Sequence, residues 1–555
     1  MEILNVKNLS FTYPVSDTKA IDNISFSVNS GEFVVVCGES GSGKTTLLKM
    51  LKREITPHGT KSGEVLYNGE SIDTMNERES AQKIGFVFQK PEQQIVTDKV
   101  WHELAFGLES LGHNSDFIRL RVGEMANYFG ISHMFRSKTQ ELSGGQKQLM
   151  NLASVMAMSP QVLILDEPTS QLDPISANDF ITTLKKLNNE LGITVIIIEH
   201  RLQEVFPIAD KVMVLEKGKM IAFDTPKNVC RQLRNHPISV GFPSAVRIWQ
   251  GAKIGGECPL TVKEGRNFIN VNFPKRKIET EEPTLDPNIQ LELKEVFFRY
   301  EKGSKDVLRG TTLKVHKGEH YCLLGGNGSG KTTTLKILAG ILKPYRGKVF
   351  VKGEKTNRLT TPQFNRLGVA LLPQNPETVF LKSSVIEDLR TLCKSKNIPE
   401  NEWNDRINPL AKQLGISHLL NKHPYDLSGG EVQKCALCKV LLSSPDVLLL
   451  DEPTKGIDAY GKESLMKILG DIKSLGVTIV TVTHDVEFAS RVADRCGLFF
   501  DGEVLSSSSP RGFFSANNFY TTSASRISRD KFENAVTVED VLSLIGDIEN
   551  EQKDY

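Results

Sequence analysis

The sequence contains one glycine-rich phrase twice, GESGSGKT at residues 38–45 and GGNGSGKT at residues 325–332. Both fit the pattern G-x-x-x-x-G-K-[ST], and each follows a short apolar run and precedes a helix-forming segment. The glycines of such a loop let backbone N–H groups turn toward phosphate, and the next helix adds the positive end of its dipole. The chain is therefore predicted to fold around two nucleotide phosphate sites, each between a strand and a helix.

The repeat covers whole domains. Residues 142–173 (LSGGQKQLMNLASVMAMSPQVLILDEPTSQLD) and 427–458 (LSGGEVQKCALCKVLLSSPDVLLLDEPTKGID) agree at 17 of 32 positions without a gap. The lysines of the two glycine-rich loops are 287 residues apart, and the aspartates of the two LDEP phrases are 285 apart. A nearly constant offset over more than a hundred residues indicates that each half is a complete unit.

The tails of the two halves also match weakly, residues 242–269 against residues 519–545. We place the boundary between the halves near 280–289, in the polar, proline-containing stretch ETEEPTLDPN. Each half then has a large domain followed by a small carboxy-terminal appendage. The predicted segments are a first ATPase domain at 1–225, its appendage and linker at 226–289, a second ATPase domain at 290–510 and its appendage at 511–555.

Short apolar runs alternate with helix-length segments within each half. EFVVVCG (32–38), QVLILDEP (161–168) and ITVIIIEH (193–200) are apolar at successive positions, which is typical of strands buried on both faces. Such strands separated by helices predict an α/β fold with a mainly parallel sheet. The predicted fold class is α/β, with two tandem nucleotide-binding domains.

Composition excludes several classes of protein. The 68 basic and 67 acidic residues nearly cancel, so a dedicated nucleic-acid binder is not expected, and the basic PKRKIE (274–279) is read as a solvated linker. No apolar run reaches the ~18–20 residues that cross a bilayer, and no secretory signal is visible. The eight cysteines lack a disulfide pattern, and Cys435 and Cys438 are interpreted as core residues. A soluble chain in a reducing cytosol is expected.

The residues of the two glycine-rich loops are the candidate phosphate ligands. Lys44 and Lys331 would add a positive charge on the phosphates, while the hydroxyls of Thr45 and Thr332 would ligate Mg²⁺. The alternative is a glycine-rich structural turn. The candidate ATP-binding residues here are Gly38, Glu39, Ser40, Gly41, Ser42, Gly43, Lys44, Thr45 and Thr46, and Gly325, Gly326, Asn327, Gly328, Ser329, Gly330, Lys331, Thr332 and Thr333.

Two adjacent acids end an apolar strand in LILDEP (163–168) and in LLLDEP (448–453). An acid at that place can reach the magnesium ion of a nucleotide, so we assign that role to Asp166 and Asp451. The next residue, Glu167 or Glu452, is predicted to polarise the attacking water as a catalytic base. The alternative is a strand-end turn with ordinary surface acids.

The order of these motifs resembles the ATP-binding cassette superfamily. In both halves the phosphate loop is followed by LSGG, then LDEP, a D-loop (SQLD at 170–173, KGID at 455–458) and a strand-terminal histidine. The resemblance implies further site residues in matching pairs. It implies that Gln89 and Gln374 join the ATP and magnesium site to a transport partner, that His200 and His484 contact the γ-phosphate, and that Tyr13 and Tyr300 stack on adenine.

The same resemblance implies that the phrase at 142–146 or 427–431, here called the signature segment, serves the ATP of the opposite domain. The candidate signature residues are Ser143, Gly144, Gly145 and Gln146, and Ser428, Gly429, Gly430 and Glu431. Two cassettes would pack head to tail within one chain, with ATP closing the halves and hydrolysis releasing them. Glu431 stands where the family has Gln, and Leu149 and Lys434 where it usually has Arg. These differences question the equality of the two sites.

A closer resemblance is to the energy-coupling-factor ATPases. The segment PEQQIVTDKVWHELAFGLES (91–110) is similar to the part of that family that contacts a transmembrane coupling protein, and NPETVFLKSSVIEDLRTL (375–392) keeps part of the pattern. The resemblance implies a peripheral ATPase at the cytoplasmic face of the membrane. Its implied partners are the coupling protein and a separate substrate-binding membrane protein, for import of a vitamin, a vitamin precursor or a transition-metal ion.

Three other functions are weighed against this one. A ribosome-associated tandem cassette protein would need a long, basic helical linker, which residues 225–289 do not resemble. A sugar-import tandem ATPase commonly has degraded motifs in one half, whereas both halves here retain theirs. A chromosome or repair ATPase would need a long heptad insertion or zinc modules, and the sequence has neither.

Overall fold

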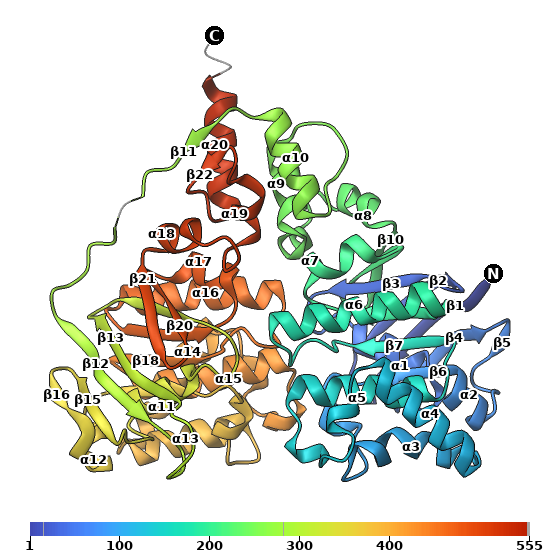
Figure 1. Ribbon diagram of the computed structural model, residues 1–555, viewed down its shortest axis with the longest axis horizontal. Coiled ribbons are helices and arrows are strands. Elements are labelled where there is room, and N and C mark those ends of the chain that lie inside the picture. Colours follow the sequence, from blue (N-terminus) through green and yellow to red (C-terminus); the bar gives the residue numbers. More distant parts are fainter. Residues whose placement is uncertain (15, 281, 552–555) are drawn as a thin grey trace. The chain divides into compact units, whose positions relative to one another are not determined.

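The computed structural model describes residues 1–14, 16–280 and 282–551 (Figure 1). Glu281, inside the predicted boundary at 280–289, and residues 552–555, at the end of the predicted second appendage, lie outside the described residues. Contacts divide the chain into two compact units. The first contains Met1–Val246 and Gly255–Thr261, and the second contains Arg247–Ile254 and the described residues from Val262 onward. The division into four segments remains a prediction.

The first unit contains a four-stranded antiparallel sheet and a six-stranded, mostly parallel sheet. The antiparallel sheet, in the order β2-β1-β4-β5, consists of β1 (Glu2–Thr12), β2 (Ile21–Asn29), β4 (Thr60–Tyr67) and β5 (Glu70–Ser71). The larger sheet, in the order β10-β9-β3-β8-β7-β6, consists of β3 (Phe33–Gly38), β6 (Ile84–Val87), β7 (Val162–Asp166), β8 (Thr194–Ile198), β9 (Lys211–Glu216) and β10 (Lys219–Asp224). Every residue of β7 and β8 is buried, as the continuous apolar runs predicted.

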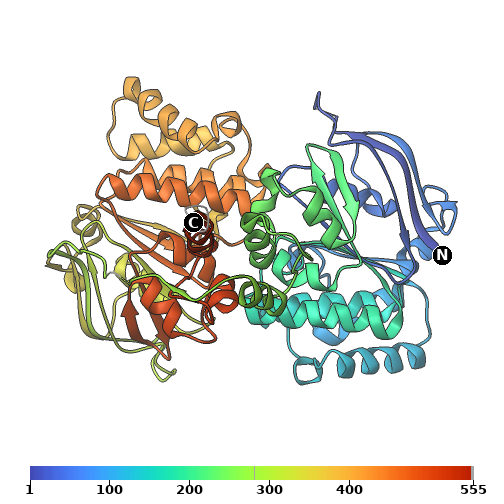
Figure 2. The same cartoon turned by 90° about the horizontal axis from the view of Figure 1, so that it is seen from above.

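The helices of the first unit connect these strands. They are α1 (Lys44–Met50), α2 (Glu77–Lys83), α3 (Val100–Ser110), α4 (Ser115–Tyr128), α5 (Gly144–Ala157), α6 (Pro174–Leu191), α7 (Leu202–Val205) and α8 (Pro226–Gln232). Figure 2 shows α3 and α4 (light blue) on one side of this unit and the antiparallel sheet (dark blue) on the other. The strand-to-helix turn from β3 into α1 carries the first glycine-rich loop.

The second unit repeats this plan in the same strand order. Its antiparallel sheet, β13-β12-β15-β16, consists of β12 (Ile289–Phe298), β13 (Leu308–His316), β15 (Arg346–Val351) and β16 (Glu354–Lys355). Its larger sheet, β17-β18-β19-β14-β20-β21, consists of β14 (His320–Leu324), β17 (Val369–Leu372), β18 (Val447–Asp451), β19 (Thr478–Thr483), β20 (Arg495–Phe500) and β21 (Glu503–Ser508). The predicted α/β fold class with two tandem domains is confirmed.

The helices of the second unit occupy the corresponding positions. They are α11 (Lys331–Leu338), α12 (Thr361–Asn365), α13 (Val385–Ser395), α14 (Trp403–Gln413), α15 (Gly429–Leu441), α16 (Ala459–Ser474), α17 (Val486–Val492) and α18 (Pro510–Ala516). Cys435 and Cys438 lie in the hydrophobic core that α15 helps to form, so their interpretation as core residues is confirmed. All eight cysteines are buried, and none of them forms a disulfide in the part of the chain that the structure describes.

Parts of the two appendages pack together in the second unit, whereas α8 and the first residues of α9 belong to the first unit. Their elements are α9 (Ser244–Ala252), α10 (Val262–Asn272) and β11 (Arg276–Lys277) from the first half, and α19 (Ser523–Ser528), β22 (Phe532–Glu533) and α20 (Val538–Glu551) from the second. β11 pairs in parallel with β22 (Figure 1), and the Arg266 side chain donates two hydrogen bonds to the backbone oxygen of Arg526, at 3.1 and 2.7 Å. A Cβ at Gly251 would meet Leu542 at 2.4 Å, so α9 and α20 are closely packed.

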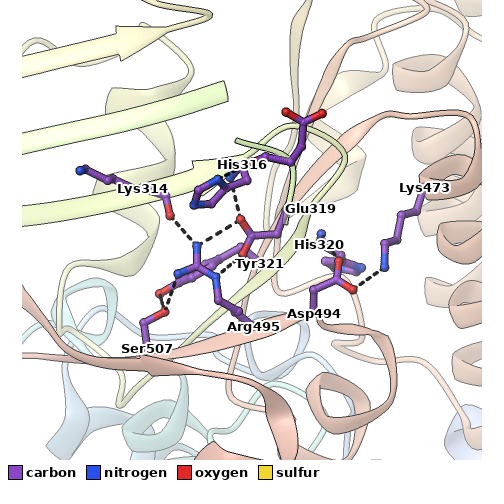
Figure 3. Close-up of polar contacts among 10 residues, drawn as sticks. Lys314, His316, Glu319, His320, Tyr321, Lys473, Asp494, Arg495 and Ser507 are labelled. Carbon is purple, nitrogen blue, oxygen red and sulfur yellow. Dashed lines mark hydrogen bonds and ion pairs between the residues drawn. The ribbon is translucent and has the colours of Figure 1, made fainter. Parts of the chain in front are cut away.

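A buried ion pair fixes the start of β14 in the second unit (Figure 3). Arg495 donates to both oxygens of Glu319, at 2.7 and 3.1 Å, and the Glu319 side chain is completely buried. Beside it, the backbone N–H of His320 donates to Asp494, and burial lowers the pKa of the His320 imidazole to about 3. Glu319 therefore has a bidentate partner, the geometry that best compensates a buried carboxylate.

The first unit has a weaker version of the same pair. Lys211 lies 3.1 Å from Glu32, and their side chains are 29% and 18% exposed, compared with 17% and 0% for Arg495 and Glu319.

No described helix in either unit is both long and apolar enough to span a membrane.

This difference predicts unequal effects of removing the two cations. Arg495→Met leaves the Glu319 carboxylate buried without its partner and is expected to lower the free energy of unfolding by about 3–5 kcal/mol. The matched change Lys211→Met is expected to cost about 1 kcal/mol or less, because that pair is more exposed. Thermal unfolding of both variants of the full chain gives the comparison. Equal shifts of the melting temperature would contradict the assigned role of burial.

Candidate functional site

Both glycine-rich loops have a backbone that only glycine permits. A Cβ on Gly38 would lie 2.2 Å from the backbone oxygen of Leu215, and one on Gly325 would lie 2.3 Å from the oxygen of Phe499. Gly43 and Gly330, which directly precede the helices, have φ angles of 96° and 113°. These conformations and close approaches exclude larger side chains, so the backbone curls into a loop at the end of the strand.

The lysine of each loop lies inside the curve of its backbone. Lys44 Nζ donates to the backbone oxygens of Gly38 and Glu39, at 2.9 and 2.8 Å, and Lys331 Nζ donates to Gly325 and Gly326 at the same two distances. Both lysine side chains are buried. Each loop therefore holds a cationic centre surrounded by backbone, as a phosphate site requires.

One serine in each loop points to the same kind of ligand. Ser42 Oγ and Ser329 Oγ are buried, and no described residue forms a hydrogen bond with either of them. A buried hydroxyl without a partner is costly in a folded protein. Phosphate oxygens are acceptors that would satisfy both hydroxyls, so the loops fit a phosphate ligand. The remaining candidates, Ser40, Gly41, Thr46, Asn327, Gly328, Thr332 and Thr333, lie in or directly after the same two loops.

The first acid after the strand contacts the phosphate loop in both halves. Thr45 Oγ1 donates to Asp166 at 3.0 Å, and Thr332 Oγ1 donates to Asp451 at 3.0 Å. Burial, and then the negative charge of Glu167, raise the pKa of Asp166 to about 6. Burial likewise raises the pKa of Asp451 to about 6. A cation beside these carboxylates would stabilise their charged form.

These donors fit a magnesium ion. The predicted ligand set offers only oxygen, from a threonine hydroxyl, an aspartate and a glutamine amide in each half: Thr45, Asp166 and Gln89, and Thr332, Asp451 and Gln374. Mg²⁺ prefers oxygen ligands and commonly takes one or two carboxylates together with nucleotide phosphates. When bound, the ion would neutralise phosphate charge.

The second acid is held in a strained conformation. Glu167 and Glu452 have φ angles of 44° and 50°, which residues other than glycine rarely adopt. Each is fixed by a backbone hydrogen bond to the neighbouring strand, Glu167 to Ile198 at 3.1 Å and Glu452 to Val482 at 2.8 Å. Such strain is concentrated at functional sites, where the surrounding structure maintains it. At these two residues the positive φ angle ends the extended backbone of the strand.

The first half brings three of its predicted site residues together: Gln89 and His200 both contact Glu167. Gln89 Nε2 donates to one carboxylate oxygen at 2.7 Å, and His200 Nε2 lies 2.8 Å from the other. Gln89 follows β6 and His200 follows β8, the two neighbours of β7 in the sheet. The side chains converge because parallel strands end at the same edge.

The second half arranges the same residue types differently. His484 Nδ1 lies 3.0 Å from Glu452, and the backbone N–H of His484 donates to the same carboxylate at 3.3 Å. Gln374 is exposed, and no hydrogen bond between described residues joins it to Glu452. The two candidate centres therefore share their residues but not their hydrogen bonds.

An exposed tyrosine stands beside each phosphate-loop helix. The hydroxyl of Tyr13 lies 3.0 Å from Thr46 Oγ1, and that of Tyr300 lies 3.0 Å from Thr333 Oγ1. Both rings are exposed to solvent. The structure thus fixes each ring at one end while leaving its face accessible, as stacking on a base requires.

Each signature segment begins a helix, with Ser143 at the amino end of α5 and Ser428 at that of α15. Ser143 exchanges hydrogen bonds with the neutral Gln146, whereas the Ser428 hydroxyl donates to the charged Glu431. The four glycines that follow these serines have no steric explanation within their own unit, because a Cβ on any of them would meet nothing closer than 3.5 Å. They are Gly144, Gly145, Gly429 and Gly430.

Three buried acids in the site region were not singled out from the sequence. Glu103 accepts hydrogen bonds from the backbone of Val96 and Thr97, and Asp388 does the same for Leu381 and Lys382. Glu199, directly before His200, is buried among the site residues. Only its position beside the strand-terminal histidine could have drawn attention to Glu199. The acid in the 91–110 segment shows no distinguishing pattern in the sequence.

Two phosphate loops, each hydrogen-bonded through its threonine to the first of two strand-end acids, define a tandem phosphate-loop ATPase. The ABC transporter family matches residues 21–170 and 308–455, which together make up more than half of the chain. A protein of Bacillus thuringiensis subsp. konkukian (strain 97-27), named as a candidate ABC transporter ATP-binding protein, is 39% identical over 545 residues, 97% of each chain. The chain therefore belongs to the ABC transporter family, as an ATP-binding subunit that hydrolyses ATP.

Two further matches are more distant. A relative from Methanosarcina mazei, with the same kind of name, is 32% identical over 525 residues, covering 91% of this chain and 88% of the relative. The solved structure of cbiO1 from Clostridium perfringens, described as part of the ABC transporter complex cbiONQ, is 30% identical. The match covers 41% of this chain and 91% of the cbiO1 chain, with a TM-score of 0.39.

The loop geometry predicts that each lysine serves only the phosphate site of its own loop. Lys44→Ala and Lys331→Ala are each expected to reduce the ATP bound per chain to about half, because one phosphate site loses its cation. Isothermal titration calorimetry in the presence of a metal chelator measures the stoichiometry without turnover. Lys49→Ala, which removes a lysine later in α1, is the control and is expected to leave the stoichiometry unchanged. Full stoichiometry in both loop variants would contradict the assignment.

Proposed function

We propose that this ATPase is the energy-coupling subunit of an importer of the energy-coupling-factor type. It would act at the cytoplasmic face of the membrane, bound to a transmembrane coupling protein and a separate substrate-binding membrane protein. The cargo would be a vitamin, a vitamin precursor or a transition-metal ion. The observation that carries the proposal is an apolar residue that each half exposes on a loop held in place by a buried acid.

In the first half, that loop directly follows Gln89 and leads into α3. The carboxylate of Glu103 accepts hydrogen bonds from the backbone of Val96, from the backbone of Thr97 and from the Thr97 hydroxyl. These bonds fold the loop so that the Val96 side chain is 67% exposed. A buried acid here holds an apolar side chain exposed to solvent. Such a side chain adds little to the stability of its own domain and is better explained as a contact for a partner.

The second half repeats the device. Asp388 accepts hydrogen bonds from the backbone of Leu381 and Lys382, and it forms an ion pair with Lys439. The Leu381 side chain is 84% exposed. The two loops correspond in sequence, because Val96 and Leu381 are 285 residues apart, as are the aspartates of the two LDEP phrases. A protein with two such loops is suited to a partner that presents two similar helical contacts.

The helices that follow the loop expose large apolar side chains in the first half, whereas α13 and α14 of the second half expose none. Trp101 and Phe106 on α3, and Leu120 on α4, are also exposed. This agrees with the fuller resemblance of residues 91–110 to the coupling-protein contact. The coupling protein would then contact the two halves unequally, with most of the apolar contact on the first.

The two ATP sites of the proposed motor would be composite. The signature glycines support this, because their own unit gives no packing reason for them and glycine permits close approach of an external group. The first site would join Lys44, Thr45, Gln89, Asp166, Glu167 and His200 to Ser428, Gly429 and Gly430. The second would join Lys331, Thr332, Gln374, Asp451, Glu452 and His484 to Ser143, Gly144 and Gly145.

In each site the chain's own groups would divide the chemistry. The loop backbone and the lysine would hold the phosphates, and the helix that begins at the opposing signature serine would direct its N–H groups to the γ-phosphate. Glu167 or Glu452 would orient the attacking water and accept its proton, while His200 or His484 would stabilise the γ-phosphate. Glu431 would add a negative charge near the first site, which Gln146 does not add near the second.

The proposed base role predicts a separation of binding from turnover. Replacing both bases, Glu167→Gln with Glu452→Gln, is expected to lower kcat for ATP hydrolysis about 100-fold or more, because no carboxylate is left to accept a proton. ATP affinity, measured by calorimetry, should stay near that of the unmodified protein, since the phosphate loops are intact. Each single variant should lose part of the turnover. Unchanged hydrolysis in the double variant would reject the assigned role.

The docking proposal predicts which partners the protein retains. Tagged protein purified from its own cells in a gentle detergent should retain small helical membrane proteins, identified by mass spectrometry. Val96→Glu with Leu381→Glu should remove them, because two charges replace the apolar contacts. The control Leu475→Glu changes a residue after α16 that is 82% exposed, close to the value for Leu381, and it should retain them. Ribosomal proteins in place of membrane partners would contradict the transport proposal.

A further inference from the structure

Glu199 occupies a position in the first half that the proposed hydrolytic mechanism does not use. Its side chain is buried, and one carboxylate oxygen accepts two hydrogen bonds from Thr169, from the backbone N–H at 3.2 Å and from the hydroxyl at 2.7 Å. The other oxygen accepts the backbone N–H of His200 at 3.2 Å. Thr169 directly precedes the D-loop at 170–173, so one carboxylate joins the D-loop to the strand-terminal histidine.

Arg201 makes a second connection between the same two segments. Its guanidinium donates to the backbone oxygen of Leu172, inside the D-loop, at 2.7 Å. The charge of Arg201 also favours the ionised form of Glu199, although burial raises the pKa of that carboxyl above its usual value. The D-loop of the first half is therefore held by the residues on both sides of His200.

The second half has neither connection. Thr483 stands at the position of Glu199, and its hydroxyl accepts the backbone N–H of Asp485 at 3.0 Å. Asp485 stands at the position of Arg201, and it caps α17 and pairs with Lys462. No described hydrogen bond in this half joins the residues beside His484 to the D-loop at 455–458.

The difference between Glu199 and Thr483 coincides with different arrangements around the two catalytic acids. In the first half the backbone N–H of His200 is taken by Glu199, and Glu167 is bound on its two oxygens by the side chains of His200 and Gln89. In the second half the backbone N–H of His484 donates to Glu452 itself. The two halves therefore differ both in the residue before the histidine and in the groups that contact the acid.

We propose that Glu199 is a positioning residue of the first hydrolytic centre: it holds the D-loop and His200 so that the His200 and Gln89 side chains orient Glu167. This inference rests on the proposed base role of Glu167. It implies that the two centres differ in mechanism. In the first, a second carboxylate supports the side chains that contact the acid, whereas in the second the backbone N–H and the side chain of His484 contact Glu452 without a carboxylate at the position of Glu199.

The test isolates the first centre by blocking the second. In the full chain carrying Glu452→Gln, the additional change Glu199→Thr installs the residue that the second half has at this position. We expect kcat for ATP hydrolysis to fall about tenfold while KM for ATP changes less than about twofold, because several hydrogen bonds to a charged group are lost away from the phosphate loop. Glu199→Gln keeps an acceptor for Thr169 and should lose less.

The matched control measures the ATP turnover of the second centre. In the chain carrying Glu167→Gln, Glu199→Thr is expected to reduce the remaining turnover much less, which also shows that the variant folds. An equal reduction of both centres would overturn the inference, since it would indicate a general structural effect. Unchanged kcat in the Glu452→Gln background would overturn it as well.

A second measurement does not depend on residual turnover. Hydrogen exchange of the peptide covering residues 165–173 should become faster in Glu199→Thr, because the amide of Thr169 loses its acceptor, while the peptide covering 450–458 should not change. Unchanged exchange at 165–173 would overturn the inference. The two proposals fail separately: if the variant with both bases replaced still hydrolyses ATP, the role of Glu167 is wrong, whereas an inactive double variant with an unaffected Glu199→Thr rejects Glu199 alone.

Discussion

The hydrogen bond between Thr45 and Asp166, repeated between Thr332 and Asp451, is the contact on which the rest of each site depends. It joins the helix after the phosphate loop to the end of the neighbouring buried strand. Because the next residue, Glu167 or Glu452, is fixed by a positive φ angle and a backbone hydrogen bond, its carboxylate has a set position relative to the loop. Phosphate binding and the proposed activation of water would then share one rigid frame.

The sequence predicted this frame almost completely, because its parts are local. The phosphate loops follow from the glycine spacing, and the strand-end acids follow from continuous apolar runs that stop at Asp166 and Asp451. The fold class follows from the same runs. Parallel strands end at one edge of a sheet, so side chains such as Gln89 and His200 had to converge once the strands were identified.

The parts that were missed depend on burial and on contacts between distant segments. Glu103 and Glu199 look like surface acids in the sequence, and only the folded chain shows that each is buried and accepts several hydrogen bonds. The inequality of Gln89 and Gln374 is also invisible in the sequence, since both occupy the same place in the motif order. Two copies of one plan have therefore acquired different side-chain networks around the same acids.

We propose that each signature segment completes the ATP site of the opposite half. Ser143→Arg, placed separately in the Glu167→Gln and Glu452→Gln backgrounds, tests it directly through the ATP turnover that remains in each. We expect Ser143→Arg to impair the site of Lys331, measured in the Glu167→Gln background, more than the site of Lys44. Ser428→Arg should have the opposite preference. Equal loss at both sites, or loss only at the site of Lys44 with Ser143→Arg, would contradict it.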